Sequence, residues 1–298
     1  MNLTKLVNNP RAVQAVIGMS YQEFTDLVPE FETALYVAAK RRRGRRRLPG
    51  AGQKGVLTTT SEKLFFILFY LKVYPTFDVL AFLFNRNRGR SCEYVHRYLK
   101  VLEEVLGRHL VLPERKIHSI EEFLEAFPDI KDVFPDGTER RIQKPKNVKR
   151  NRRMYSGKKK AHTRKNVVVV SDKKRILMMT PTKPGRRHDK RAADNRLLGE
   201  RIPPHVDIWT DTGFQGLQHL HPRVHTPQKA TKKHPLTPQQ REENRLIASF
   251  RVVSEHALSG MKRFGVVSQV LRNKLGRFDD RAAFVCAGLW NLHLRYQI

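Results

Sequence analysis

The sequence predicts a mixed α/β layer domain preceded by an all-α region. Up to about residue 110, apolar residues recur at helical spacing, three or four positions apart. From about residue 133, short apolar runs rich in β-branched residues begin to alternate with helical segments, which is typical of a sheet with flanking helices. The third observation is charge, because 58 Lys and Arg against 28 Asp and Glu give a net charge of +30.

This charge favours nucleic acid as the partner. Each phosphate that a basic chain neutralises releases a condensed counterion, which drives binding. An anionic membrane is less favoured, since no basic amphipathic anchor is visible. An RNA-binding protein of the ribosome-assembly type is a further alternative, but it needs an aromatic-rich RNA platform that the sequence does not show.

The cysteines and apolar runs indicate an intracellular protein. Cys92 and Cys286 lie far apart in apolar helical patterns, which suits buried, reduced thiols and neither a disulfide framework nor a zinc site. Residues 1–16 contain no apolar run of the signal-peptide type. The apolar run 64–71 is too short to span a bilayer.

Residues 1–56 are expected to form N-terminal helices followed by a basic arm. Gly and Pro follow a dense basic run that cannot be buried, so we expect it to lie along a DNA backbone or in the minor groove. A solvated charge run or a targeting signal is the alternative. The arginines of this arm are Arg41, Arg42, Arg43, Arg45, Arg46 and Arg47.

Residues 57–110 have the pattern of a helix-turn-helix unit. Thr59 and Glu62 form a capping box, Pro75 ends the first helix, and Ser91 is expected to cap the third. The N-terminal end of that helix could enter a major groove. An ordinary three-helix bundle with a basic loop is the alternative. The candidate DNA contacts here are Arg86, Arg88, Arg90, Arg97 and Lys100.

A connecting helix is expected within residues 111–132, followed by the α/β domain at 133–298. Its strands are predicted at 133–145, 165–172, 175–182 and 206–211, and its helices at 190–201, 242–264 and the C-terminus. The helix at 242–264 should bury an apolar stripe formed by Leu246, Phe250, Val253, Ala257 and Met261.

Three carboxylates stand out in this domain. Asp136 and Asp211 end apolar strands beside small residues, where ligands commonly bind, and Glu255 lies outside the apolar stripe of its helix. Oxygen ligands suit Mg²⁺, and a pair of such ions can activate a water or a 3′-hydroxyl for phosphodiester chemistry. The alternative is that each Asp is a turn or cap residue and that Glu255 pairs with a Lys.

The chain resembles the DDE transposases of bacterial insertion sequences, in the fifth insertion-sequence family, and less closely Harbinger-type elements. The resemblance runs from about Leu57 to the C-terminus. It rests on the segments DGTERRIQKP (136–145), YSGKKKAHTRKNVVVV (155–170), GRRHDK (185–190), TDTGFQG (210–216) and NRLIASFRVVSEHALSGMKRF (244–264).

The resemblance implies an RNase H-like mixed sheet with flanking helices behind the helix-turn-helix region. It assigns the catalytic, metal-binding triad to Asp136, Asp211 and Glu255, whose separations, 211 − 136 = 75 and 255 − 211 = 44, are compatible with the family. It further implies two Mg²⁺ ions per active site, with Mn²⁺ as a substitute. TDTGFQG departs from the usual ADKGYQG-like form but keeps the acid and both glycines.

The implied activity is cleavage next to the terminal inverted repeats and joining of the 3′ ends to target DNA. The implied partners are double-stranded DNA and at least one further copy of the chain, in the bacterial cytoplasm at the nucleoid. A catalytically silent DNA-binding protein, such as a domesticated repressor, is the alternative.

Several other polar residues have the chemistry to contact DNA or the active site. His188 and Asp189 are candidate neighbours of the active site, with a cap or local hydrogen bond as the alternative, and His162 could orient a phosphate. The candidate backbone contacts in this part of the chain are Lys158, Lys159, Lys160, Arg164, Arg251 and Lys262.

Overall fold

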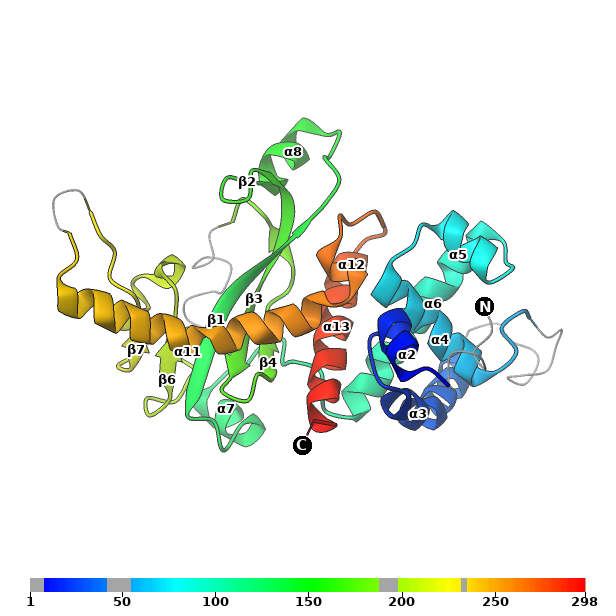
Figure 1. Cartoon of the computed structure of the whole chain (residues 1–298), viewed down its shortest axis with the longest axis horizontal. Coiled ribbons are helices and arrows are strands. Elements are labelled where there is room, and N and C mark those ends of the chain that lie inside the picture. The colour runs from blue at the N-terminus through cyan, green and yellow to red at the C-terminus, as the bar shows by residue number, and fades with distance from the viewer. Residues whose placement is uncertain (1–7, 42–54, 188–197, 232–234, 298) are drawn as a thin grey trace. The chain divides into compact units, whose positions relative to one another are not determined.

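The computed structural model describes residues 8–41, 55–187, 198–231 and 235–297 (Figure 1). Contacts between Cα atoms divide the chain into two compact units. The first comprises Met1–Leu112, Met261–Gln269 and Asn273–Ile298, and the second Pro113–Gly260 and Val270–Arg272. The division therefore places the C-terminal helices in the same unit as the N-terminal helices. The domain boundaries that we expected follow sequence order, and they stay a prediction.

The described part of the first unit is helical, as the sequence predicts. The capping box of Thr59 and Glu62 is confirmed at the start of α4, whose residues 64–71 are all buried. A helix that is apolar on every side needs neighbours all round, and the surrounding helices supply them. These elements are α2 (Pro10–Ile17), α3 (Tyr21–Lys40), α4 (Thr60–Val73), α5 (Phe77–Leu83), α6 (Arg88–Arg108), α12 (Gly265–Ser268) and α13 (Phe278–Arg295).

The start of α6 corrects one expectation. Asn87, not Ser91, caps this helix, and its side chain accepts a hydrogen bond from the Gly89 backbone N–H at 2.8 Å. Asn is as good a cap as Ser, and it comes four residues earlier. Ser91 is instead buried in the first turn, where its hydroxyl donates to the Asn87 carbonyl. Consequently Arg88 and Arg90 belong to the helix rather than to the turn before it.

The C-terminal helix α13 packs against α6 within the first unit. Gly288 allows the close approach, because a Cβ at this position would lie 2.7 Å from Leu112 Cδ2 and 3.2 Å from Leu106 Cδ1. An ion pair between Arg281 and Glu103 joins the same two helices. At the far end of α13, His293 bonds to Glu23 of α3, a carboxylate that is only 1% exposed.

The second unit is built on a mixed sheet. Its central strand, β1, is antiparallel to β3 and parallel to β6, which in turn is parallel to β7. The strands predicted from the sequence are all present, each within a few residues of its expected range. The strands are β1 (Asp132–Arg141), β2 (Tyr155–Ser156), β3 (Ala161–Ser171), β4 (Ile176–Met179), β5 (Lys183–Pro184), β6 (Asp207–Trp209) and β7 (Val224–His225).

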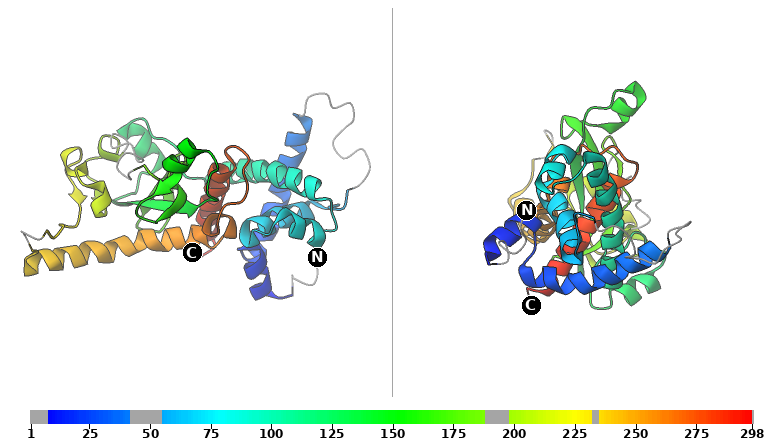
Figure 2. Two further views of the ribbon diagram at one scale, coloured as in Figure 1. Left: turned by 90° about the horizontal axis from the view of Figure 1, so that it is seen from above. Right: turned by 90° about the vertical axis from the view of Figure 1, so that its right-hand side faces the viewer.

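Helices cover both faces of this sheet. One face packs a hydrophobic core that includes Val133, Val167 and Val169 against Phe123 of the connecting helix α7 (Ile120–Ala126). The long helix α11 (Pro238–Lys262) runs along the opposite face, which the two views in Figures 1 and 2 show. A short helix, α8 (Val148–Met154), and two 3₁₀ turns, η1 (Thr212–Phe214) and η2 (Leu217–His219), complete the described elements.

The apolar stripe predicted for α11 is buried only in its C-terminal half. Ala257 and Met261 are fully buried, but Leu246 is 56% and Phe250 43% exposed. The periodicity identified the helix correctly, yet burial depends on what the helix faces, and the sheet does not cover its first turns. The helix predicted at 190–201 lies mostly outside the described residues.

Candidate active site

Asp136 lies in the middle of β1 and not at its end, where we expected it, because the strand continues past it to Arg141 in its pairing with β3. Asp211 lies two residues beyond the end of β6. β1 and β6 are parallel and pair Val133 with Ile208, so each Asp stands three residues beyond a matched position. Because strand side chains alternate between faces, both Asp residues belong to the face of their matched neighbours Asp132 and Asp207. Neighbouring strands lie about 4.8 Å apart, so the register places the two residues at equivalent positions along β1 and along the chain that continues from β6.

A hydrogen bond and a ring stack establish that α11 covers this face. Trp209 of β6 donates its Nε1–H to Asp132 Oδ1 at 2.7 Å, which places both side chains on one side of the sheet. The indole also stacks on Phe250 of α11, with ring centroids 4.4 Å apart. The face that carries Asp136 and Asp211 is therefore the face that α11 packs against.

Ser254 connects α11 directly to Asp136. It is 1% exposed, and its hydroxyl lies 3.5 Å from Asp136 Oδ2 while donating to the Arg251 carbonyl at 2.8 Å. Glu255 is the next residue and is exposed, on the helical turn whose Ser254 lies beside Asp136 in the middle of β1. The structure thus brings Glu255 to the turn facing Asp136, although the two strand carboxylates come from elsewhere in the sequence.

Both Asp side chains also make local hydrogen bonds. Asp136 Oδ1 accepts from the Gly137 N–H at 2.7 Å, and Asp211 Oδ1 accepts from the Gly213 N–H at 2.8 Å as the cap of η1. Among the residues that the structure describes, no three acidic, His or Cys side chains stand close enough to hold a metal ion. Asp136 and Asp211 lie on the sheet face that α11 covers, and Glu255 lies on α11 itself, but the three carboxylates do not form a closed ligand set.

A buried ion pair fixes β1 beside β3 within the same paired stretch that contains Asp136. Glu139 and Lys165 are register partners, their charged atoms are 3.2 Å apart, and their side chains are 5% and 6% exposed. Thr163 donates a further hydrogen bond to Glu139 at 2.7 Å. Burial raises the pKa of Glu139, but the hydrogen bonds from Thr163 and Ser156 and the charge of Lys165 outweigh it, leaving the pKa below its usual value. The pair holds β1 in place three residues from Asp136.

The remaining predicted residues of the second unit lie at several places. Lys158, Lys159 and Lys160 occupy the exposed turn before β3, and Arg164 is half-buried in β3. Arg251 is half-buried on α11, one turn before Glu255. His188 and Asp189 fall outside the described residues.

Two further residues are placed by their contacts or position. His162 contacts protein groups, since its Nε2 lies 2.9 Å from Asn151 Oδ1 and its ring meets Tyr155 edge-on. Lys262 is exposed at the end of α11.

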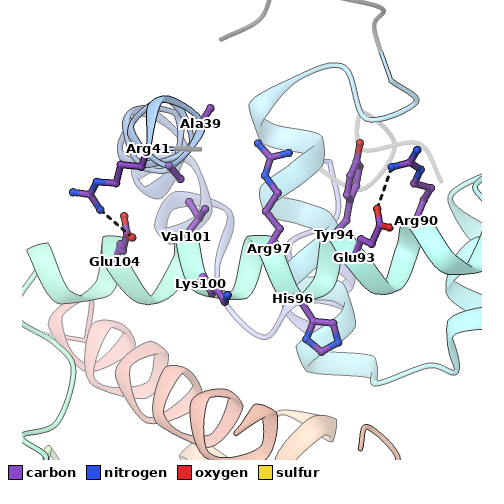
Figure 3. A pocket seen from close by; sticks show the side chains of 11 residues that line it. Ala39, Arg41, Arg90, Glu93, Tyr94, His96, Arg97, Lys100, Val101 and Glu104 are labelled. Carbon is purple, nitrogen blue, oxygen red and sulfur yellow. Dashed lines mark hydrogen bonds and ion pairs between the residues drawn. The ribbon is translucent and has the colours of Figure 1, made fainter. Parts of the chain in front are cut away.

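The helical unit has a basic groove of about 690 Å³ along α6, shown in Figure 3. Four of the predicted DNA contacts gather there, namely Arg41, Arg90, Arg97 and Lys100. Ion pairs to Glu104 and Glu93 orient Arg41 and Arg90, at 3.5 and 3.1 Å. The basic residues of α6 and Arg41, the first arginine of the predicted arm, therefore line the same groove.

Other predicted basic residues of this unit have different settings. Arg86 places its guanidinium 4.0 Å from the centre of the Tyr94 ring, and Arg88 pairs with Asp78 at 3.2 Å. Arg42, Arg43, Arg45, Arg46 and Arg47 lie outside the described residues.

A comparison with known protein families identifies the family of this chain. Residues 135–291 match the family described as "DDE superfamily endonuclease". The chain belongs to this family. Residues 56–108 match its partner domain, described as "Helix-turn-helix of DDE superfamily endonuclease", which covers α4 to α6. The resemblance to DDE enzymes and the helix-turn-helix reading are both confirmed.

One relative extends the similarity over the whole chain. The "Probable transposase for insertion sequence element IS702" of Microchaete diplosiphon is 26% identical over 284 residues, which cover 95% of each chain. No solved structure matches this DDE endonuclease. Among the described residues we also find no helix with the length and apolar character needed to cross a bilayer.

Sequence reasoning missed Ser254 and the Trp209–Phe250 stack. Ser254 precedes Glu255 and continues the buried phase of α11, which is the signal that could have identified it. The stack had no such signal, because it joins residues 41 positions apart through the packing of the helix on the sheet.

Proposed function

We propose that this DDE endonuclease is the transposase of an insertion sequence. It binds the terminal inverted repeats of its element, cuts the DNA at the element ends and joins the 3′ ends to target DNA. The observation that carries the proposal is that Asp136 and Asp211 each lie three residues beyond the paired Val133 and Ile208 of the parallel strands β1 and β6, with Glu255 on the helix that covers this face. The description of the relative as a probable transposase and the net charge of +30 support it.

The three carboxylates are the proposed ligands of divalent cations, with two Mg²⁺ ions per site and Mn²⁺ as a substitute. Their oxygens suit a hard cation, and their common face lets them act together. When bound, the ions supply Lewis acidity at the scissile phosphate. The protein's own contribution is to keep Asp136 and Asp211 in register through β1 and β6, while Ser254 holds α11 against Asp136.

Substrate binding is assigned to the positive surfaces of both units. In the helix-turn-helix, Arg90, Arg97 and Lys100 lie along α6, the helix whose N-terminal part would enter the major groove. The lysines at 158–160 and Arg164 would contact the backbone near the active site. Because two ends must be cut and joined together, we propose at least a dimer in the synaptic complex.

Cleavage of a plasmid that carries the gene with its native flanks tests this function. Wild type with Mg²⁺ is expected to cut at the element boundary, and EDTA or Asp211→Asn is expected to abolish the cut, since the substitution removes a charge and almost no volume. Asp172→Asn is the matched control, because Asp172 is exposed in the turn after β3 and should leave cleavage unchanged. Cleavage by Asp211→Asn at the wild-type rate would refute the assignment.

A catalytically silent DNA-binding protein is the second candidate. The capping bond of Asp211 to Gly213 favours it, because a carboxylate can persist as a turn residue without chemistry. Specific binding to the flanks, with no cut in Mg²⁺ or Mn²⁺, would support this alternative over the transposase.

A further inference from the structure

A cavity of about 610 Å³ in the second unit adjoins η1, the turn that Asp211 caps. Gly213 lines it, and the Gly213 N–H is the group that bonds to Asp211. The opposite wall comes from α8, β2 and the turn after β2, and the floor includes Lys165 of β3. The cavity therefore opens beside one of the proposed catalytic carboxylates, although none of the three carboxylates lines it.

The lining combines positive charge with one aromatic ring. Arg152, Lys158, Arg186 and Arg187 contribute cationic side chains, and all four residues are exposed, so their charges are available to a ligand. The cavity lining contains no carboxylate among the residues that the structure describes there. Such a lining selects an anion, and guanidinium groups are well suited to the oxygens of a phosphate.

Tyr155 adds a second element of recognition. It is 42% exposed, so part of its surface is open to the cavity, while His162 meets its ring edge-on with centroids 5.6 Å apart. His162 is itself held by Asn151, which also lines the cavity. An aromatic ring braced in this way offers a flat surface on which a nucleobase of any sequence can stack.

Two glycines without side chains leave the volume of the cavity open. Gly185 is buried in the lining, and a Cβ at this position would lie 2.0 Å from Thr163 Oγ1. Gly157, at the other side, has open space where a Cβ would stand. Lys165 is fixed by Glu139 and by the Arg187 carbonyl at 3.0 Å, so the floor of the cavity is built from paired groups.

We propose that this cavity binds one nucleotide that has left the base stack of the DNA next to the cut. Its phosphate lies among Arg152, Arg186 and Arg187, and its base stacks on Tyr155. This proposal rests on the proposed function. It adds that one nucleotide of the DNA substrate lies outside the base stack, next to the cut. Gly213 links the two, because a nucleotide in the cavity would adjoin the strand end that carries Asp211.

The size of the cavity favours a single nucleotide over duplex DNA. Its volume falls in the range of about 300–1,000 Å³ typical of small-molecule sites. A cube of 610 Å³ has an edge of about 8.5 Å, whereas the major groove of a duplex alone is about 12 Å wide. A duplex could contact the exposed arginines at the rim but could not reach Tyr155 with a base.

Binding to abasic DNA tests the stacking directly. Duplexes that carry the element boundary are prepared with one base removed at each of the three positions on either side of the cut, and affinity is measured in EDTA so that nothing is cleaved. Tyr155→Ala is expected to weaken binding of intact DNA by about 5- to 160-fold, the range measured for base–aromatic stacking. On the duplex that lacks the stacked base, the same substitution should have no effect.

Matched variants separate the ring from its surroundings. Tyr155→Phe keeps the stacking surface and should bind as wild type does. Arg186→Gln should weaken binding to intact and abasic DNA equally, because it removes a phosphate contact, and Lys173→Gln, an exposed residue outside the cavity, should change neither. An equal effect of Tyr155→Ala on every abasic duplex would overturn the proposal.

A labelled single-stranded tetranucleotide distinguishes this proposal from the proposed function. If the chain neither binds nor cuts element ends but binds the tetranucleotide with an affinity that Tyr155→Ala reduces, the cavity is a nucleotide site and the transposase assignment fails. If the ends are bound and cut while Tyr155→Ala affects neither ligand, the transposase stands and the nucleotide site is refuted.

Discussion

Replacing Glu139 with Gln should strongly destabilise the sheet that carries the proposed catalytic residues. The substitution preserves the volume and removes the charge that faces Lys165 across the β1–β3 pair. Lys165 is 5% exposed, and its ammonium lies 3.2 Å from Glu139 and donates to the Arg187 carbonyl at 3.0 Å. In the variant, the Lys165 ammonium loses its negatively charged partner, and because it is buried, water does not solvate it in exchange.

The magnitude follows from the burial of both groups. Removing one partner of a buried ion pair costs about 3–5 kcal/mol, a large part of the roughly 5–15 kcal/mol that stabilises a typical domain. For a unit of this size, about 2–4 °C in melting temperature corresponds to each kcal/mol, so the expected loss is about 6–20 °C. In contrast, Glu242→Gln in the exposed pair with Arg245 should cost less than about 1 kcal/mol, because both side chains are more than 70% exposed.

The assay is urea unfolding followed by the fluorescence of Trp209. The chain has two tryptophans, Trp209 in the second unit and Trp290 in the first, so Trp290→Phe makes Trp209 the reporter of the unit that contains the pair. Trp209 stacks between His225 and Phe250, and it loses both rings when the unit unfolds.

A double variant gives the sharpest test of the reasoning. Glu139→Gln with Lys165→Met removes both charges, so most of the lost stability should return. If Glu139→Gln costs no more than Glu242→Gln, the pair is not the buried constraint that we describe. If the double variant is as unstable as the single one, the cost does not come from an uncompensated charge.

Three further predictions concern both units. Arg97→Gln with Lys100→Gln should lower the slope of log affinity against log salt for element-end DNA by about 1.8, or 0.9 per phosphate contact, and an unchanged slope would remove them from the interface. Burial raises the pKa of Glu23, but hydrogen bonds from His293 and Ser20 outweigh it and hold the pKa below its usual value of 4.5. This carboxylate therefore stabilises the fold above about pH 4.5, and the stabilisation is lost as pH falls through the folded-state pKa. Glu23→Gln should lose less stability than wild type when urea titrations are repeated at acid pH. Gly185→Ala should cost about 1–3 kcal/mol in the same titrations, because its Cβ would meet Thr163 Oγ1 at 2.0 Å, and wild-type stability would contradict that packing.

The sequence predicted the element types well, and the reason is local. Apolar spacing and capping residues act within a few positions, so the box of Thr59 and Glu62 and the strand before Asp136 could be identified without tertiary information. The cap of α6 was misplaced because Asn87 and Ser91 are both good caps and only the folded chain selects between them.

The site could be predicted as a set of residues but not as an arrangement. Asp136 and Asp211 could be selected because each follows an apolar run, whereas the sequence did not show that β1 continues past Asp136 or which strands pair and in which direction. The contact of Ser254 with Asp136 spans 118 residues and depends on how α11 packs. The exposure of Leu246 has the same origin, since no local pattern reveals where the sheet stops covering the helix.

Binding of Mn²⁺, followed by electron paramagnetic resonance, tests the central claim most directly, because it reports the ligands without requiring DNA or cleavage. Asp136→Asn, Asp211→Asn and Glu255→Gln should each weaken Mn²⁺ binding, and Asp172→Asn, at an exposed site away from the triad, should bind as wild type does. Weakening by all three substitutions would establish that the two strand ends and α11 hold the metal together. Mn²⁺ binding that none of the three substitutions alters would contradict the account.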